Sequence, residues 1–163
     1  MEKFEIVKME PDHGKEVMEI FNFYIETTNA AYPPQPLPEV FFGKIMDMTA
    51  GYPAFTILSD KKVVGFCFLK PHNPLPTFRR SAEITYFIKK DYTGLGLGKM
   101  ALDILEQEAP KFGIRNILAS ISGDNEGSLN FHLKNGFTEC GRFKDAGEKF
   151  GKTFDIVWMI KKL

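Results

Sequence analysis

Three glycines at alternate positions form the segment of the sequence best suited to hold a ligand. Gly94, Gly96 and Gly98 lie between a strand-like run and a helix-like run. Glycine lets the backbone approach a ligand closely and turn its N–H groups outward, and the N-terminus of a following helix adds partial positive charge. A tight strand-to-helix turn needs fewer glycines than this. The spacing therefore predicts a phosphate or pyrophosphate site.

Two familiar nucleotide loops are excluded by the same spacing. A P-loop requires Gly, four residues and then Gly-Lys-Ser/Thr, but Thr93 stands where the first glycine belongs and Met100 where the hydroxyl belongs. The dinucleotide pattern G-x-G-x-x-G fails in both registers, because its third glycine falls on Lys99 or on Ala101. Only the looser form of that pattern accepts alanine.

Two side chains elsewhere have the chemistry of acid–base catalysis. Glu83 lies in the strand-like segment Ser81–Tyr86 and could act as a general base, although an exposed carboxylate is ordinary on a strand. His132 lies on a short helix-like segment, where a lone histidine is more often structural. The two cysteines form no C-x-x-C pair, so no metal or dithiol site is expected.

These residues must be positioned by an alternation of strands and helices. Runs rich in β-branched and aromatic residues predict strands at Phe4–Lys8, Ala54–Leu58, Val63–Leu69, Ala82–Ile88, Asn116–Ile121, Thr138–Phe143 and Thr153–Ile160. Apolar periodicity and breakers predict helices over the stripe Val17–Ile25, over Glu39–Met48, from Leu97 to Pro110, and over Ser128–Lys134. A loop is expected between the last two strands. This order predicts an α/β or α+β fold with a partly antiparallel sheet.

Length, charge and hydropathy narrow the classes of function. A chain of 163 residues suits a single domain spanning residues 1–163. The 21 basic and 21 acidic residues give a net charge of +0, which disfavours a nucleic-acid partner, because such proteins neutralise phosphates with basic side chains. No apolar run is long enough to span a bilayer and no signal peptide is apparent. A cytoplasmic protein without a membrane partner is expected.

The glycine segment and a second block together resemble the GNAT superfamily of N-acetyltransferases. The acetyl-CoA loop of that family, R/Q-x-x-G-x-G/A, is similar to Thr93–Gly98, with Thr93 in place of Arg or Gln. The family block N-x-x-A/S…Y/H…G-F is similar to Asn125–Phe137. The chain further resembles the phosphinothricin acetyltransferase branch, through Phe21–Ile25, Thr28, Ser128–Phe137 and Gly147–Lys152. The branch often has Phe where Tyr32 stands and Trp where Thr153 stands.

The resemblance implies a fold and a cofactor site. The fold would be a GNAT-like mixed, mostly antiparallel sheet of about seven strands flanked by about four helices. The backbone of Tyr86, Phe87 and Ile88 would pair with the pantetheine arm. The pyrophosphate would lie against the loop residues Gly94, Leu95, Gly96, Leu97, Gly98 and Lys99. Asn125 would hydrogen-bond the pantetheine, and Lys134 would meet a CoA phosphate.

The resemblance also implies catalytic and acceptor residues. Glu83 would be the general base, and His132 would protonate the departing sulfur or help orient the acceptor. Tyr32, Phe78 and Arg79 would frame the acceptor pocket, where an arginine favours a carboxylate or phosphinate acceptor. No metal is expected.

The function expected on this basis is acetyl-CoA-dependent N-acetylation of a small-molecule amine, an amino acid or an analogue such as phosphinothricin or methionine sulfoximine. Acetylation of a protein N-terminus or a polyamine is an alternative acceptor choice. A non-catalytic acyl-CoA-binding sensor is an alternative from another class, and the presence of Glu83 favours catalysis over it. The branch further implies a homodimer.

Overall fold

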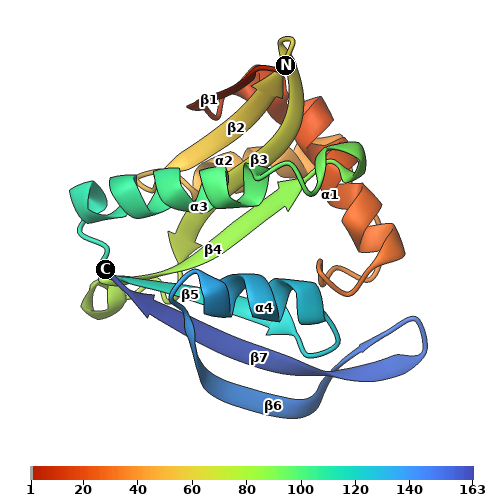
Figure 1. Ribbon diagram of the computed structural model, residues 1–163, viewed down its shortest axis with the longest axis vertical. Coiled ribbons are helices and arrows are strands. Elements are labelled where there is room, and N and C mark those ends of the chain that lie inside the picture. The colour runs from red at the N-terminus through yellow and green to blue at the C-terminus, as the bar shows by residue number, and fades with distance from the viewer. Residues whose placement is uncertain (1) are drawn as a thin grey trace.

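Seven strands form one sheet in the computed structural model, which describes residues 2–163 (Figure 1). They run in the order β1-β2-β3-β4-β5-β7-β6. Every neighbouring pair is antiparallel except β4 and β5, which are parallel. The bounds are Phe4–Lys8 (β1), Ala54–Ser59 (β2), Lys62–Pro71 (β3), Ser81–Ile88 (β4), Asn116–Ser122 (β5), Thr138–Lys149 (β6) and Lys152–Lys162 (β7). The mixed, mostly antiparallel sheet is thereby confirmed.

Four α-helices flank this sheet, also as expected. They span Gly14–Thr27 (α1), Phe42–Met48 (α2), Leu97–Glu108 (α3) and Glu126–Lys134 (α4). Helix α3 packs against the sheet with the side that carries Leu97, Ala101 and Leu105, which are buried. It then passes into the short turn Ala109–Phe112, and Gly113 ends that turn at a φ of 81°. A positive φ favours glycine, because it has no Cβ to clash with the backbone.

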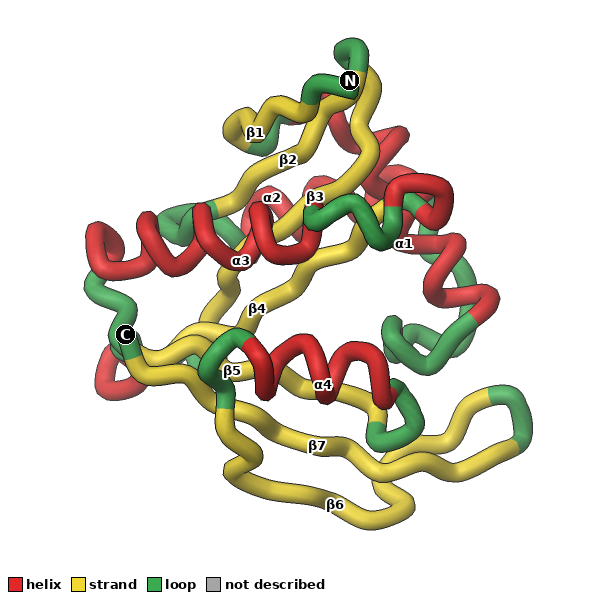
Figure 2. Tube along the Cα trace, in the orientation of Figure 1, coloured by secondary structure: helices red, strands yellow, loops and turns green. Residues whose placement is uncertain are grey.

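The helices cover the two faces of the sheet in pairs (Figures 1 and 2). Leu105 of α3 belongs to one core with buried side chains of β3, β4, β5 and β7, and Leu129 of α4 packs against this core. Val17 of α1 and Ile45 of α2 belong to a second core that contains Phe66 of β3. Strands β3 and β4 are therefore covered on both faces, and residues of β4 face two different layers of helix.

The parallel pair β4–β5 is joined over only part of its length. Ser81–Glu83 pairs with Asn116–Leu118, and beyond these residues the two strands have no register with each other. Since the strands are parallel, both continue in the same direction, and their ends Ile84–Ile88 and Ala119–Ser122 separate. The edge of β4 that faces β5 is left without a strand partner after Glu83.

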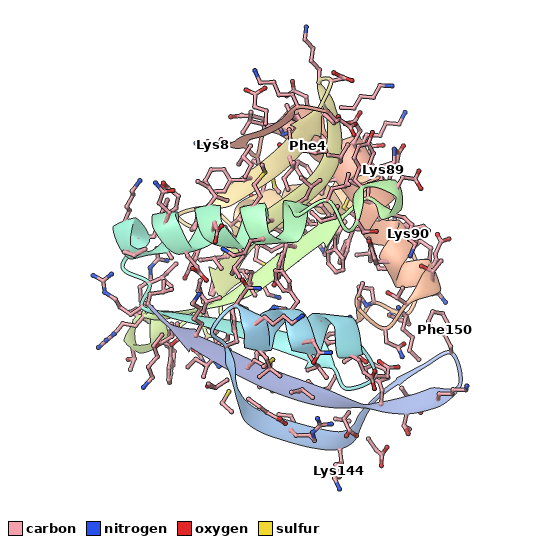
Figure 3. The ribbon with its side chains drawn as sticks, viewed as in Figure 1. Phe4, Lys8, Lys89, Lys90, Lys144 and Phe150 are labelled. Carbon is pink, nitrogen blue, oxygen red and sulfur yellow. The ribbon has the colours of Figure 1, made fainter. Side chains whose placement is uncertain are left out.

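The hairpin of β6 and β7 is longer than expected. The sequence predicts a loop between Phe143 and Thr153, but the strands continue to a tight turn at Phe150 and Gly151, both with positive φ (Figure 3). The ladder shifts register between Phe143 and Gly147, where the carboxylate of Asp155 accepts a hydrogen bond from the backbone N–H of Asp145. This part of the hairpin is mostly exposed, so its sequence is polar and lacks the alternation that identifies a strand.

Candidate active site

A cavity of about 1350 Å³ opens where β4 and β5 separate. Its walls come from α1 and the loop after it, from β3, β4 and β5, from the glycine segment, and from α4. The lining is mainly apolar, with a small number of polar side chains. Such a cavity is typical of a small-molecule site.

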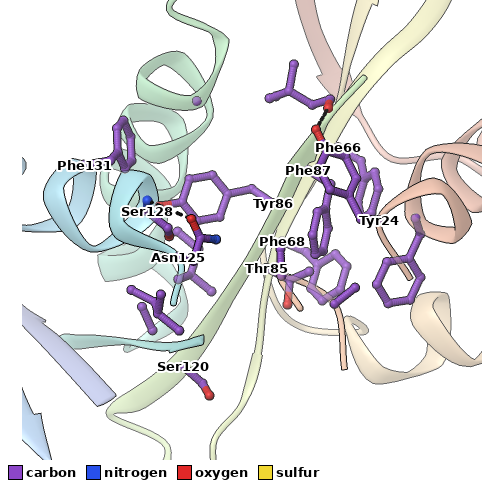
Figure 4. A pocket seen from close by; sticks show the side chains of 18 of the residues that line it. Tyr24, Phe66, Phe68, Thr85, Tyr86, Phe87, Ser120, Asn125, Ser128 and Phe131 are labelled. Carbon is purple, nitrogen blue, oxygen red and sulfur yellow. Dashed lines mark hydrogen bonds between the residues drawn. The ribbon is translucent and has the colours of Figure 1, made fainter. Parts of the chain in front are cut away.

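Strand β4 divides this cavity into two sides (Figure 4). Tyr86 points toward α4, where its ring packs against Phe131. Phe87 points the other way, where its ring packs against Phe21 and Tyr24 of α1. Successive side chains of a strand alternate between its faces, so Glu83 shares the side of Phe87. We call these the α4 side and the α1 side of the cavity.

The glycine segment forms one end of the lining. Gly94 and Gly96 have φ angles of 79° and 82°, in the left-handed region. Gly96 immediately precedes α3, whose first N–H groups lack partners within the helix. A Cβ built on either glycine would meet no other atom within 4 Å, so the space beside the backbone is open. The side chain of Lys99 lines the cavity and pairs with Asp103. This arrangement suits an anionic group such as a pyrophosphate.

His132 and Tyr86 form a buried hydrogen-bonded pair on the α4 side. His132 is 4% exposed, and its Nδ1 lies 2.7 Å from the carbonyl oxygen of Ser128. A carbonyl only accepts, so Nδ1 carries the proton and Nε2 accepts from the hydroxyl of Tyr86 at 2.5 Å. Burial lowers the pKa of His132 and raises the pKa of Tyr86, which favours the neutral form of both. Both ring nitrogens of His132 are thus occupied within the protein.

Glu83 lies on the α1 side within a polar cluster. Its side chain is 20% exposed, and Oε2 lies 3.1 Å from Nδ1 of His72. Lys70 of β3 stands directly opposite Glu83 in the ladder and also lines the cavity. The hydroxyl of Tyr32 lies 3.0 Å from Oγ of Ser120. Burial raises the pKa of Tyr32, and the negative charges of Asp124 and Glu83 add to this effect.

The structure brings most of the sequence-predicted residues together around this cavity. Those that line it are Tyr32, Glu83, Tyr86, Phe87, Ile88, Gly94, Gly96, Leu97, Gly98, Lys99, Asn125 and His132. Besides the contacts given above, two of them have polar groups bonded within the protein. The carbonyl of Ile88 accepts from the hydroxyl of Tyr24 at 2.5 Å, and Oδ1 of Asn125 accepts from the backbone N–H of Ser128, capping α4. The amide nitrogen of Asn125 remains available to a ligand.

Four predicted residues lie outside the lining: Phe78, Arg79, Leu95 and Lys134. The guanidinium of Arg79 donates to the carbonyls of Gly51 at 2.7 Å and Phe112 at 3.3 Å, and lies 4.1 Å from the ring centroid of Tyr52. It thus ties the loop after β3 to two neighbouring turns. This position does not fit the expected contact between Arg79 and an acceptor.

Several lining residues escaped the sequence analysis, namely Lys70, Ser120, Trp158, Phe66 and Phe68. The place of Lys70, Phe66 and Phe68 depends on cross-strand register, which the sequence leaves open where β3 and β4 are joined by a long loop. Ser120 and Trp158 are register partners on β5 and β7. His72, just past the β3–β4 ladder, contacts Glu83. Among residues 2–163, no group of three or more His, Cys, Asp or Glu side chains is arranged to hold a metal ion. No helix in that range is long and apolar enough to cross a membrane.

Comparisons with known proteins agree with this geometry. The chain is 28% identical over 147 residues to an L-methionine sulfoximine/L-methionine sulfone acetyltransferase of Pseudomonas paraeruginosa, covering 88% of this chain and 85% of that protein. It is 23% identical over 154 residues to a phosphinothricin N-acetyltransferase of Streptomyces coelicolor, covering 91% and 90%. A structure of a putative acetyltransferase from Acinetobacter baylyi superposes with a TM-score of 0.95 at 26% identity, over 100% of this chain and 93% of that one.

The family model described as the acetyltransferase (GNAT) family matches residues 17–137, which include most of α1, the glycine segment and α4. This range contains Glu83, His132 and the separated ends of β4 and β5. The chain therefore belongs to the GNAT family of acetyltransferases.

Proposed function

We propose that this protein transfers the acetyl group of acetyl-CoA to the α-amine of a small amino acid or amino acid analogue. The named relatives support this acceptor class, among them an L-amino acid N-acyltransferase of Escherichia coli that is 30% identical over 114 residues, covering 70% of this chain and 66% of that protein. The observation that carries the proposal is that Glu83 and Lys70 stand opposite each other in the β3–β4 ladder and line the α1 side of the cavity. The glycine segment and Tyr86 lie across β4 from them.

The residues present fit acetyl-CoA on the α4 side. The open space beside Gly94 and Gly96, at the start of α3, would receive the pyrophosphate. The edge of β4 after Glu83 lacks a strand partner and would take the pantetheine arm as an added strand, with the backbone of Tyr86 and Phe87 contributing. When bound, acetyl-CoA supplies an acetyl group activated as a thioester.

Glu83 would remove the proton that blocks the acceptor. An amine of pKa about 10 is neutral in only about one molecule per thousand at pH 7, a handicap of roughly 4 kcal/mol. A carboxylate within hydrogen-bond reach, or linked through one water, takes that proton and leaves the nitrogen lone pair free to attack. Glu83 faces the cavity from the strand whose free edge would hold the thioester arm, so base and donor are fixed by one element.

Lys70 would hold the acceptor carboxylate. Its side chain lines the cavity and makes no side-chain hydrogen bond or ion pair with any residue in the range 2–163. Directly opposed residues of antiparallel strands have Cβ atoms about 4.5–5.5 Å apart. An α-amino acid carries its ammonium and carboxylate on one carbon, so it can contact Glu83 and Lys70 together. This complementarity favours an α-amino acid over a polyamine, which has no carboxylate.

His132 and Tyr86 would act differently from the sequence expectation. Both residues line the cavity, and with both nitrogens of His132 occupied, the Tyr86 hydroxyl would be the group of this pair that acts there. We propose that His132 orients Tyr86, and that the phenol oxygen lies beside the sulfur of the donor. Lys134, exposed outside the lining, stays a proposal for a CoA phosphate contact.

We further propose a cytoplasmic, single-domain protein of residues 1–163 that forms a homodimer. Among the residues that the structure describes, helices α1 and α2 pack on β3 and β4, and their core includes no side chain on the same face of β5, β7 and β6. Phe143, 60% exposed, and Ile156 are register partners on this face. Sedimentation velocity of the wild type and of Phe143→Glu tests this: a dimer that dissociates in the variant supports it, and a monomeric wild type contradicts it.

The acceptor proposal is tested by release of free CoA thiol with panels of amines. α-Amino acids should release thiol, and their decarboxylated amines should do so far less at equal concentration. Activity confined to peptides with a free N-terminus or to polyamines would overturn the acceptor class. Tight acetyl-CoA binding with no turnover on any panel would instead indicate a sensor.

A further inference from the structure

We infer that His72 is a positioning residue for Glu83, which holds the carboxylate in the orientation needed for proton transfer. The inference rests on the proposed role of Glu83 as base. His72 follows directly after β3, whose last register pair is Pro71 with Ala82. From there the imidazole reaches the neighbouring strand, and Nδ1 lies 3.1 Å from Oε2 of Glu83.

The hydrogen bond divides the two oxygens of Glu83 between two tasks. An ionised carboxylate only accepts, so Nδ1 of His72 is the donor, and Oε2 is occupied. Glu83 makes no other side-chain hydrogen bond with the described residues, 2–163. Oε1 is therefore the oxygen left to receive the proton of an acceptor amine in the cavity. Both the neutral Nδ1–H form and the imidazolium form of His72 can make this bond.

A second contact fixes the imidazole itself. The ring of Trp158, on β7, meets the ring of His72 edge to face, with centroids 5.7 Å apart and planes at 77°. Trp158 and Glu83 line the cavity, whereas His72 lies outside its lining with a side chain 40% exposed. His72 thus touches the walls of the site and acts on the reaction only through Glu83.

The same bond keeps the acceptor site open. Lys70 stands opposite Glu83, and an ammonium and a carboxylate at that spacing attract each other. A Glu83–Lys70 ion pair would occupy the base and the proposed carboxylate anchor together. Within residues 2–163, the titratable groups that face Glu83 are Lys70 from β3, His72 from the following loop and Tyr32 from the loop after α1, and of these only His72 is bonded to it. The hydrogen bond from His72 therefore keeps the carboxylate of Glu83 from forming an ion pair with Lys70.

The test is steady-state kinetics on the full chain with His72→Ala, His72→Leu and His72→Asn. An asparagine amide nitrogen superposes on Nδ1 of histidine, so His72→Asn should recover most of the activity that the other two lose. A misplaced catalytic group costs up to about 100-fold, and we expect kcat/KM for the acceptor to fall about 10- to 100-fold in the Ala and Leu variants. The affinity for acetyl-CoA, measured by calorimetry, should not change, because that site lies across β4.

Two controls separate this role from a disturbed loop. Asn73→Ala changes the neighbouring residue, whose side-chain oxygen accepts a hydrogen bond from the backbone N–H of Leu75 and is not bonded to Glu83. This variant should keep the wild-type rate. In a Glu83→Gln background, His72→Ala should cause little further loss, because its partner is already disabled. An additive loss there, an equal loss in Asn73→Ala, or wild-type kinetics in His72→Ala would overturn the inference.

The inference and the proposed function fail in different ways. If Glu83→Gln lowers turnover while His72→Ala does not, only the positioning role is wrong. If Glu83→Gln is fully active, the base assignment is wrong and the inference falls with it. If no amine is acetylated, the NMR signals of the imidazole nitrogens still test the contact between His72 and Glu83. Nδ1 of His72 should be protonated and its signal should move in Glu83→Gln, and an unchanged signal would overturn the contact.

Discussion

Replacing Lys70 with Met removes the positive charge from the α1 side of the cavity and keeps most of the apolar length of the side chain. Lys70 is the last residue but one of β3 and stands opposite Glu83. Because the substitution leaves the backbone pairing intact, the fold and the acetyl-CoA site should be preserved. The affected quantity should be the affinity for the acceptor carboxylate.

The size of the effect follows from the loss of one charge-assisted hydrogen bond. Such a bond contributes about 1.5–3 kcal/mol, and each 1.4 kcal/mol corresponds to about tenfold in affinity. Lys70 is only partly buried, so solvent screens its charge and the lower part of this range applies. We expect KM for an α-amino acid to rise about 10- to 30-fold, with a smaller change in kcat.

The assay compares each amino acid with its own decarboxylated amine. Lys70→Met should raise KM for the amino acid and leave KM for the amine almost unchanged, because the amine offers no carboxylate. Arg79→Ala is the matched control: its guanidinium binds the carbonyls of Gly51 and Phe112 away from the cavity, so thermal stability should fall without a selective change in KM. Equal changes for both substrates in Lys70→Met, or a selective change in Arg79→Ala, would refute the reasoning.

Two further predictions concern the α4 side. Gly96→Glu should abolish the rise in melting temperature that acetyl-CoA causes in the wild type, because it puts bulk and negative charge at the open start of α3. The control is Gly113→Glu, at the similar φ of 81°, which should lower the stability of the protein and keep the rise that acetyl-CoA causes. Burial lowers the pKa of His132 in the folded protein below its ordinary 6.5, so protonation favours the unfolded chain. The stability that the neutral histidine contributes is present above about pH 6.5 and is lost as the pH falls toward the pKa of the folded protein. Urea unfolding should therefore show a steeper loss for the wild type than for His132→Gln below about pH 6.5, and parallel curves would contradict the buried neutral histidine.

The sequence predicts the elements of this fold because their signals are local. The apolar stripes of α1 and α3 and the short strands rich in β-branched residues can be found without knowledge of the partners they pack against. The glycine segment between a strand and a helix likewise follows from spacing alone, whereas the left-handed φ of Gly94 and Gly96, which Gly98 does not share, comes from the structure. The sequence does not predict the second half of β6 because it is exposed, and a polar strand interrupted by a register shift resembles a loop in sequence.

The acceptor side of the site depends on register, and register is not local. The fold expected from the resemblance would bring the loop of Arg79 toward the acceptor, and an arginine there is a good partner for a carboxylate. The structure instead places Lys70 and His72 beside Glu83, because β3 pairs with β4 across a long loop whose conformation has no simple sequence signal. The roles themselves remain predictions for experiment.

The central claim, that Glu83 is the base of an acetyl transfer, is tested most directly by the pH–rate profile of Glu83→Gln. Glutamine keeps the size and hydrogen bonding of the side chain and removes its basicity. Turnover at neutral pH should fall about 10²- to 10⁴-fold while acetyl-CoA affinity by calorimetry is retained, and the residual rate should climb with pH as more of the amine is neutral. Full activity of Glu83→Gln at neutral pH, with an unaltered profile, would contradict the account.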